Sequence, residues 1–206
     1  MKEKVVLRSA HPEEYPDLEI ECLVIPNEEI GAYLESIRGE AEEVLAYKSG
    51  SVMARMGEEG EKVDTVLTTV IDGKEYILGE ESNTVKKRVC ADGVERCDIV
   101  VTNTSSTSNE RYVVKYDKFI QTYELDSTLS HGCMMPAYRY IPVPEERLLT
   151  RVGENVIIMT SWGAPAICLE GSFIVTYNAD ANDYNTLEQG AFNSTYTVTG
   201  TPKKRN

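Results

Sequence analysis

Asp98-Ile99-Val100-Val101-Thr102 and Ser172-Phe173-Ile174-Val175-Thr176 are two versions of one β-rich stretch, and a polar loop and a tyrosine follow each of them. Runs of β-branched and aromatic residues of this length are typical of strands. Three further pairs of segments match in the same order: Ala46-Tyr47-Lys48 with Ala137-Tyr138-Arg139, Glu61-Lys62-Val63 with Glu154-Asn155-Val156, and 119–123 with 192–196. Four matching blocks in one order predict two diverged copies of a single strand-rich unit.

Turn-forming dipeptides divide each copy into hairpins. Asp72-Gly73 and Asp92-Gly93 are strong hairpin signals between strand-like runs. They predict pairing of 65–71 with 75–78 and of 86–90 with 99–102. In the second copy, 161–165 is expected to connect the strands 156–159 and 166–169. Antiparallel sheets are the expected product.

The segment before the first copy has the pattern of an amphipathic helix. Its apolar positions recur at helical spacing, at Ile30, Leu34, Ile37, Ala41 and Val44. Asn27 precedes them and is a residue type that caps helices, with acidic residues in the first turn. Residues 1–45 are therefore expected to form strands and one helix that packs on the first unit.

Together these patterns predict an α+β fold that is mainly β. It has two similar small antiparallel-sheet, half-barrel-like units plus one N-terminal helix. The expected segments are 46–125 for the first β-rich repeat, 126–136 for a linker, 137–200 for the second repeat and 201–206 for a basic tail.

Composition excludes several classes of function. The 34 acidic residues outnumber the 21 basic ones, so the net charge of −13 disfavours direct binding to nucleic acid. No apolar run approaches the ~20 residues that cross a membrane, and no secretion signal is recognisable at the N-terminus. Five thinly spread cysteines suit reduced thiols. We expect a soluble protein of the cytoplasm, in a host cell if the chain is phage-encoded.

Two sequence stretches resemble a domain family of phage and bacterial proteins named for a PGDYG motif. They are the segments that end in DIVVTN and SFIVTY, and the later segments YVVKYDKFIQTYE and YNTLEQGAFNSTYTV. The motif itself is degenerate, since Cys97-Asp98-Ile99 and Gly171-Ser172-Phe173 each retain one residue of the Gly-Asp pair. The family has no established activity. The resemblance therefore implies a phage or mobile-element setting and no catalytic residue.

An aromatic residue beside a cation occurs in the first matching block of both copies, as Tyr47-Lys48 and Tyr138-Arg139. Such pairs suit an anionic or base-containing ligand, although ordinary packing of a tyrosine also explains them. Trp162, the sole tryptophan, is predicted in a turn, where recognition and core packing are both open. These five residues form the predicted ligand-binding set.

Cysteine and histidine give two weaker candidates. Cys90, Cys97, His131 and Cys133 have ligand types that suit zinc, but their spacing differs from that of structural zinc sites. His131 and Cys133 could form a nucleophile and its base, although catalytic pairs of this kind usually come from distant parts of a chain. Scattered free thiols are the competing interpretation.

No constellation of catalytic residues is evident, so we expect a non-catalytic binding or interaction protein without a cofactor. Its expected partner is a small anionic, nucleotide-like ligand or a host protein. One alternative is an acidic inhibitor that mimics nucleic acid toward a host defence enzyme, and another is a thiol-dependent enzyme. The sequence leaves the oligomeric state open.

Overall fold

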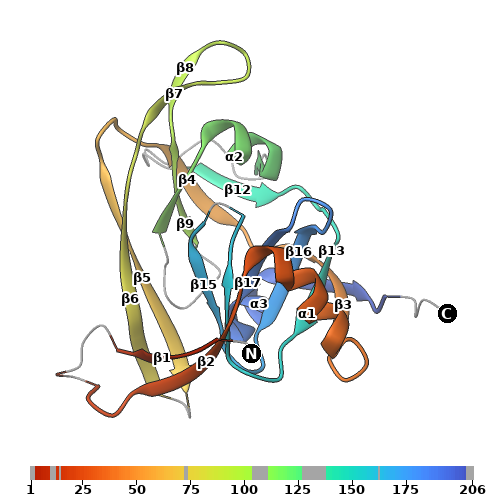
Figure 1. Cartoon of the computed structure of the whole chain (residues 1–206). Helices are drawn as coiled ribbons and strands as arrows, with labels where there is room; N and C mark the ends of the chain where they lie inside the picture. Colours follow the sequence, from red (N-terminus) through yellow and green to blue (C-terminus); the bar gives the residue numbers. More distant parts are fainter. Residues whose placement is uncertain are drawn as a thin grey trace. The chain divides into compact units, whose positions relative to one another are not determined.

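The protein is described by a computed structural model that covers residues 3–9, 13, 15–71, 74–103, 111–126, 138–161 and 163–202. It is mainly β, with antiparallel sheets and few helices, as the sequence predicts (Figure 1). The chain divides into two compact units: unit 1 lies within 1–47 and 145–206, and unit 2 spans 48–144. Among the described residues, no helix has the length and hydrophobicity to cross a bilayer.

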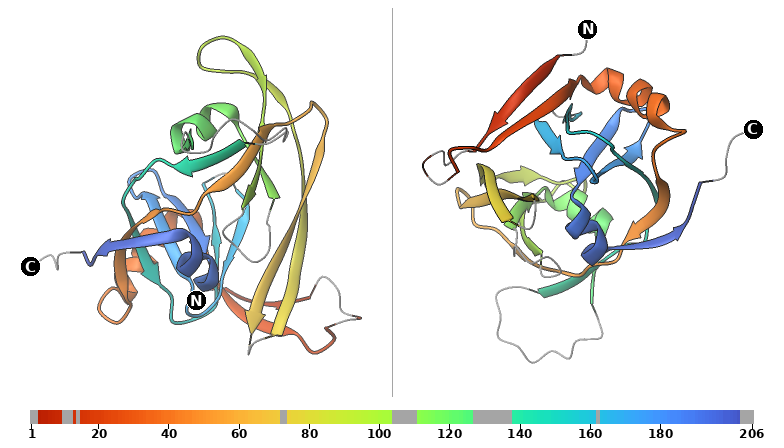
Figure 2. Two further views of the ribbon diagram at one scale, coloured as in Figure 1. Left: turned by 180° about the vertical axis from the view of Figure 1, so that it is seen from behind. Right: turned by 90° about the horizontal axis from the view of Figure 1, so that it is seen from below.

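Unit 2 is built on a five-stranded sheet of order β10-β9-β4-β12-β11. Its elements are β4 (Val52–Met56), β9 (Ile99–Asn103), β10 (Arg111–Val114), α2 (Tyr116–Thr122), β11 (Tyr123–Leu125) and β12 (Tyr138–Pro142). Alternate residues of β4 and β9 are buried against Phe119 of α2. The Phe119 ring meets Tyr140 edge to face at 4.8 Å, so α2 lies beside β12, as both views of Figure 2 show.

Two hairpins extend from the sheet of unit 2. β5 (Lys62–Ile71) pairs with β6 (Lys74–Thr84) as predicted, while the Asp72-Gly73 turn lies outside the described residues. β7 (Lys87–Val89) pairs with β8 (Glu95–Cys97), and Gly93 has φ +79° in the turn between them. The predicted partner of 86–90 was 99–102, which is wrong. That segment is β9 and pairs with β4 and β10 instead.

Unit 1 contains a second five-stranded sheet, of order β17-β16-β13-β3-β18. Its elements are β3 (Glu43–Lys48), whose last residue belongs to unit 2, β13 (Arg147–Arg151), β16 (Phe173–Asn178), β17 (Asp183–Leu187), α3 (Gln189–Thr195) and β18 (Tyr196–Gly200). Phe173, fully buried, packs 4.4 Å from the ring of Phe192 in α3. This contact fastens α3 to the sheet.

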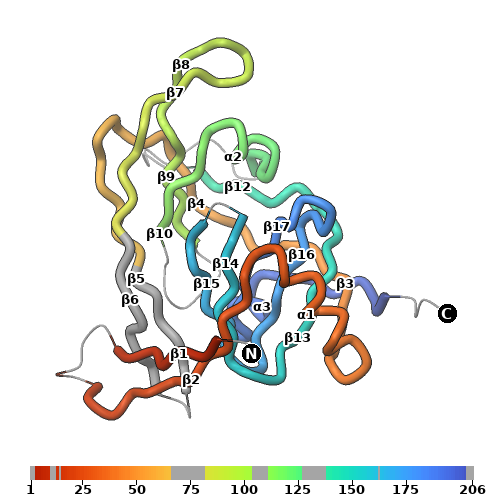
Figure 3. The backbone as a smooth tube through the Cα atoms, viewed as in Figure 1, coloured from red at the N-terminus to blue at the C-terminus, as the bar shows by residue number. Residues whose placement is uncertain are grey.

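A four-stranded sheet of order β1-β2-β14-β15 completes unit 1, and Figure 3 follows its path along the backbone. It comprises β1 (Lys4–Arg8), β2 (Glu19–Ile25), β14 (Val156–Met159) and β15 (Pro165–Cys168). The last two strands form the hairpin that the sequence predicts. β2 pairs with β14 in parallel. The sequence predicts that the N-terminal segment packs on the first copy. In the structure its strand β2 pairs instead with β14, which belongs to the second copy.

The N-terminal helix is shorter than predicted. The chain forms a 3-10 turn, η1 (Asn27–Glu29), then α1 (Ile30–Ile37), and Val44 lies in β3. Asn27 does not cap this helix, since the N-cap of α1 is Glu29. The Asn27 Nδ2 instead donates to the carbonyls of Met159 and Asn182, each at 2.9 Å. Val44 continues the apolar spacing of the helix only by coincidence. It is buried because it lies in β3.

The two five-stranded sheets share one strand order. In unit 2, β12 lies between β4 and β11, and in unit 1, β3 lies between β13 and β18. Each of these strands comes from the half of the sequence that forms the rest of the other sheet. Both helices also end alike, since Tyr123 donates its backbone N–H to Phe119 O and Tyr196 donates to Phe192 O. This interleaving is why the compact units do not coincide with the predicted segments 46–125 and 137–200.

Candidate functional site

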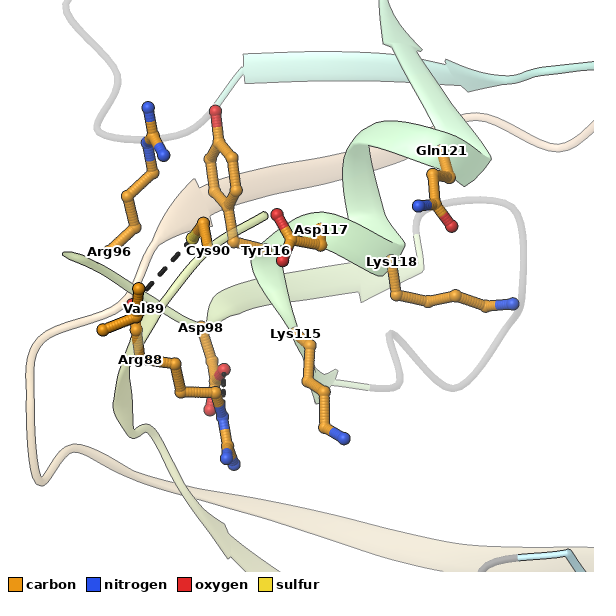
Figure 4. A pocket seen from close by; sticks show the side chains of 10 residues that line it. All are labelled: Arg88, Val89, Cys90, Arg96, Asp98, Lys115, Tyr116, Asp117, Lys118 and Gln121. Carbon is orange, nitrogen blue, oxygen red and sulfur yellow. Dashed lines mark hydrogen bonds and ion pairs between the residues drawn. The ribbon is translucent and has the colours of Figure 1, made fainter. Parts of the chain in front are cut away.

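A pocket in unit 2 lies between the β7–β8 hairpin and α2 (Figure 4), with a volume of about 310 Å³. This is the lower end of the range for small-molecule sites. Its lining residues are Arg88, Val89, Cys90, Arg96, Asp98, Lys115, Tyr116, Asp117, Lys118 and Gln121. Four of these side chains are cationic and two are acidic, whereas the whole chain has 34 acidic and 21 basic residues. The pocket therefore concentrates positive charge in an acidic protein.

Asp98 is the buried anchor of the pocket and is 3% exposed. Its Oδ1 accepts a hydrogen bond from Arg88 Nε at 3.0 Å, and its Oδ2 accepts one from the Lys86 backbone N–H at 3.0 Å. A buried carboxylate is stable only when it is paired in this way. Asp98 thus joins β7 to the start of β9 and fixes the direction of the Arg88 side chain.

Arg96 is held by a second aspartate and by an aromatic ring. Its Nη1 donates to Asp92 Oδ1 at 2.7 Å, and its guanidinium lies 4.7 Å from the centroid of Tyr116. The hydrogen bond from Arg96, followed by one from the Val94 N–H, lowers the pKa of Asp92 to about 2. Asp92 therefore stays ionised above that pH, and its hydrogen bond and the Tyr116 ring hold the Arg96 side chain between β8 and α2.

Arg88 and Arg96 are directly opposite each other in the hairpin register. Like charges at such positions destabilise a pair of strands. Here each arginine has its own carboxylate, Asp98 for Arg88 and Asp92 for Arg96. These carboxylates offset part of the repulsion between the two guanidinium groups, and both arginines line the pocket.

The other cations are Lys118 of α2 and Lys115, the residue just before this helix. Asp117 Oδ2 accepts a hydrogen bond from the Ala91 N–H at 3.0 Å, which fastens the hairpin to the helix. Lys115 and Lys118 are exposed, and neither has a carboxylate oxygen within 4 Å among the residues that the structure describes. Their ammonium groups are available to an anionic ligand.

The described lining of the pocket shows no nucleophile that is hydrogen-bonded to a side-chain base. Its described lining includes no histidine or serine. Its thiol, Cys90, is buried, with Sγ 3.9 Å from the Arg88 carbonyl oxygen. A nucleophile needs a base within hydrogen-bond reach, and the Cys90 thiol instead lies against a backbone carbonyl.

The predicted ligand-binding residues lie elsewhere. Lys48 Nζ donates to Tyr123 Oη at 2.7 Å, and Arg139 pairs with Asp126 at 3.5 Å, both within unit 2. Tyr138 is 61% exposed on β12. Tyr47 belongs to unit 1, and Trp162 lies outside the described residues. None of the four described residues lines the pocket.

Sheet register also separates the two tyrosines that the sequence aligned. In the sheet of unit 2, Val101, Ala54 and Tyr138 face one another on three neighbouring strands. In the sheet of unit 1, the residues that do so are Val175, Leu149 and Val44. Since Val101 and Val175 occupy matching places, Tyr138 corresponds to Val44 and not to Tyr47. Recurrence of a tyrosine beside a cation is therefore not a shared feature of the two sheets.

The predicted metal ligands are only partly described. Cys90 is buried and Cys97 is half-buried, both in unit 2, while His131 and Cys133 lie outside the described residues. Within the described part of the chain, no group of three or more histidine, cysteine or acidic side chains could hold a metal ion. The zinc site stays a prediction.

Sequence reasoning missed the cations of the pocket, although a signal was present. Lys86-Lys87-Arg88 is a basic run in an acidic chain, and Asp92-Gly93 predicts a turn that returns Arg96 toward it. Lys115 and Lys118 have the spacing of neighbours on a helix. What the sequence could not supply was the docking of that helix against the hairpin.

Comparison with protein-family models, with curated proteins and with solved structures finds no match for this chain. The resemblance to the PGDYG-motif family therefore stays a prediction.

Proposed function

We propose that this protein is a non-catalytic binding protein that takes a small anionic ligand in the pocket of unit 2. The observation that carries the proposal is that Arg88, Arg96, Lys115 and Lys118 all line one pocket of about 310 Å³. Asp98 and Asp92 hold the two arginines in place. Ligand binding therefore costs less side-chain conformational entropy than it would with two free arginines.

Positive charge is the property that selects the ligand. Even when Asp92, which lies outside the lining, is counted with Asp98 and Asp117, cationic side chains outnumber acidic ones around the pocket. The acidic remainder of the chain repels anions in general. A compact ligand that reaches the pocket gains several charge-assisted hydrogen bonds, whereas a long nucleic acid would meet the acidic surface around it.

The test is thermal unfolding of the full chain with a panel of anionic small molecules and uncharged analogues. A ligand at 100 times its Kd stabilises the folded state by about 2.7 kcal/mol. We expect an increase in Tm with at least one anion and none with its neutral analogue. The increase should vanish in the double variant Arg88→Gln, Lys115→Gln and persist in Lys62→Gln, which removes an exposed cation outside the lining. Stabilisation that survives the double variant would refute the proposal.

The ancestry and setting of the protein are part of this proposal. The shared strand order of the two five-stranded sheets supports descent from one duplicated unit. The phage or mobile-element setting depends on the resemblance to the PGDYG-motif family alone. The cytoplasmic location depends on the wide spacing of the cysteines.

An acidic inhibitor of a host enzyme is the second candidate, and the net charge of −13 favours it. Such an inhibitor would bind a basic protein partner with strong salt dependence. Neutralising exposed glutamates away from the pocket would weaken that binding, whereas Arg88→Gln would not. The same variants therefore separate the two functions.

A further inference from the structure

Arg88 has a geometry that the other cations of the pocket lack. Its Nε is occupied by the Asp98 carboxylate, and its two Nη groups have no hydrogen-bond partner among the described residues. The Arg88 side chain is 42% exposed, while that of Asp98 is 4% exposed. A buried anchor therefore holds the inner edge of the guanidinium and leaves its outer donors to the pocket.

Lys115 lies on the same side of the pocket as the free end of Arg88. Figure 4 shows the Arg88 guanidinium and the Lys115 ammonium extending in the same direction, away from the hairpin. A planar guanidinium with a neighbouring ammonium offers both paired and single N–H donors. An arginine fork pairs with carboxylates and phosphates alike. A dianion with three terminal oxygens can accept from the guanidinium and the ammonium together and match both of their charges, whereas a monocarboxylate has one charge and two oxygens.

The corresponding place in unit 1 lacks this arrangement. Asp98 O accepts a hydrogen bond from the Gly57 N–H at 3.0 Å, and Ser172 O accepts one from the Val152 N–H at 2.9 Å, each just before the matching strand. Ser172 therefore occupies the place of Asp98. A serine has no carboxylate to hold an arginine, so the fold does not require the Asp98–Arg88 pair at this position.

We propose that Arg88 and Lys115 bind the phosphate group of the ligand and that Asp98 is a positioning residue for Arg88. This inference depends on the proposed anion-binding function and names the chemical class of the ligand. The phosphate could be free or part of a phosphate ester such as a nucleotide. Both sources present the same terminal oxygens to Arg88 and Lys115.

The experiment is NMR titration of the isotope-labelled full chain with inorganic phosphate, with adenosine monophosphate and with acetate. Phosphate and the nucleotide should shift the signals of Arg88 and Lys115, and acetate should bind at least about tenfold more weakly. A nucleotide that binds more tightly than inorganic phosphate identifies an ester as the ligand. Equal affinities would show that the pocket recognises the phosphate group alone.

Variants assign the roles. Lys115→Gln and Arg88→Lys should each weaken phosphate binding about tenfold, because each removes a charge-assisted hydrogen bond. Lys62→Gln should change it less than about twofold, which is the effect of an exposed charge distant from the site. An unchanged Kd for phosphate in both Lys115→Gln and Arg88→Lys would overturn the assignment.

Asp98→Asn tests the positioning role and needs a readout beyond stability. In the native protein the Arg88 Nε–H should give a slowly exchanging NMR signal, since Asp98 accepts it. The variant should lose that signal and bind phosphate about tenfold more weakly while keeping the dispersed amide spectrum of a folded chain. A folded Asp98→Asn variant with native affinity would refute the role of Asp98, and Lys115→Gln still tests the phosphate site if Asp98→Asn does not fold.

The outcomes for ligand class and for function are distinguishable. Acetate or another carboxylate that binds as tightly as phosphate would overturn the phosphate assignment and leave an anion-binding protein. A chain that binds none of these anions, nor any member of the thermal panel, would overturn both.

Discussion

Tyr138 lies directly opposite Ala54 in the sheet of unit 2, and Ala46 lies opposite Arg147 in the sheet of unit 1. Each of these contacts joins segments that belong to different matching halves of the sequence. β12 fills the place between β4 and β11, and β3 fills the place between β13 and β18. Neither sheet can therefore be completed by one half of the chain.

Separating the chain between β11 and β12 should give two fragments that fold only together. Fragment 1–126 lacks β12, which leaves β4 and β11 without the strand between them, and fragment 127–206 lacks β3, which leaves β13 and β18 in the same state. We expect each fragment alone to lack cooperative unfolding, and an equimolar mixture to recover it. Circular dichroism during urea titration measures this. Cooperative unfolding of either fragment alone would contradict the interleaved topology.

Gly57 should tolerate no side chain. A Cβ at Gly57 would lie 2.7 Å from Val85 Cγ2 and 3.1 Å from the Asp98 backbone oxygen, closer than van der Waals contact allows. Gly57→Ala should therefore lower the free energy of unfolding by about 1–3 kcal/mol. The matched control is Gly153→Ala, where nothing lies within 4 Å of the new Cβ. Equal urea midpoints for the two variants would show that Val85 and β9 can move apart.

Phe173 should be a main determinant of the stability of unit 1. Its side chain is fully buried and contacts the ring of Phe192, so Phe173→Ala removes both the burial and an aromatic pair. We expect a loss of about 3–5 kcal/mol in the free energy of unfolding. Val198→Ala, at a residue that is 51% exposed in the same unit, should change it by less than about 0.5 kcal/mol. Chemical denaturation followed by tyrosine fluorescence compares them.

The sequence predicts the strands of this fold better than their partners. β9 and β16 follow from runs of β-branched residues, because such runs favour a buried pleated surface. Alternation indicates which face of a strand is buried but not which strand lies beside it. The pairing of β12 with β4 therefore could not be predicted from the pattern. The wrong pairing of 86–90 with 99–102 has the same cause, because the pattern does not indicate which strand lies beside which.

The pocket was hidden for a related reason. Arg88 and Arg96 could be expected to face each other once the Asp92-Gly93 turn was recognised. Lys115 lines the same pocket as these arginines because α2 docks against the hairpin, through Asp117 and the Ala91 N–H. A single long-range hydrogen bond of this kind leaves no periodic trace in a sequence.

Cysteine reactivity should follow burial. Cys22 and Cys168 are buried, and burial raises the pKa of both thiols, that of Cys168 to about 12. At pH 8 about one Cys168 thiol in ten thousand is then a thiolate, the form that reacts. Cys97, which is half-buried, should react with iodoacetamide far faster than either. Mass spectrometry of the digested, alkylated native protein gives the order. Cys133 that reacts faster than Cys97 would favour the thiol-dependent enzyme.

The raised pKa of Cys168 also predicts a loss of stability at alkaline pH. The unfolded thiol ionises near its ordinary value of 9.0, whereas the folded thiol stays protonated to about 12. The unfolded state therefore loses its proton first. The contribution of Cys168 to the free energy of unfolding is complete below pH 9 and declines as pH rises toward 12.

Cys168→Ala should be less stable than the native chain at pH 7, because it leaves a small cavity, but its stability should fall less steeply between pH 9 and pH 11. Burial raises the pKa of Tyr33 and Tyr184 as well, so the informative quantity is the difference between the two urea-unfolding curves at each pH. A difference that does not change with pH would mean that the Cys168 thiol is accessible to water in the folded protein.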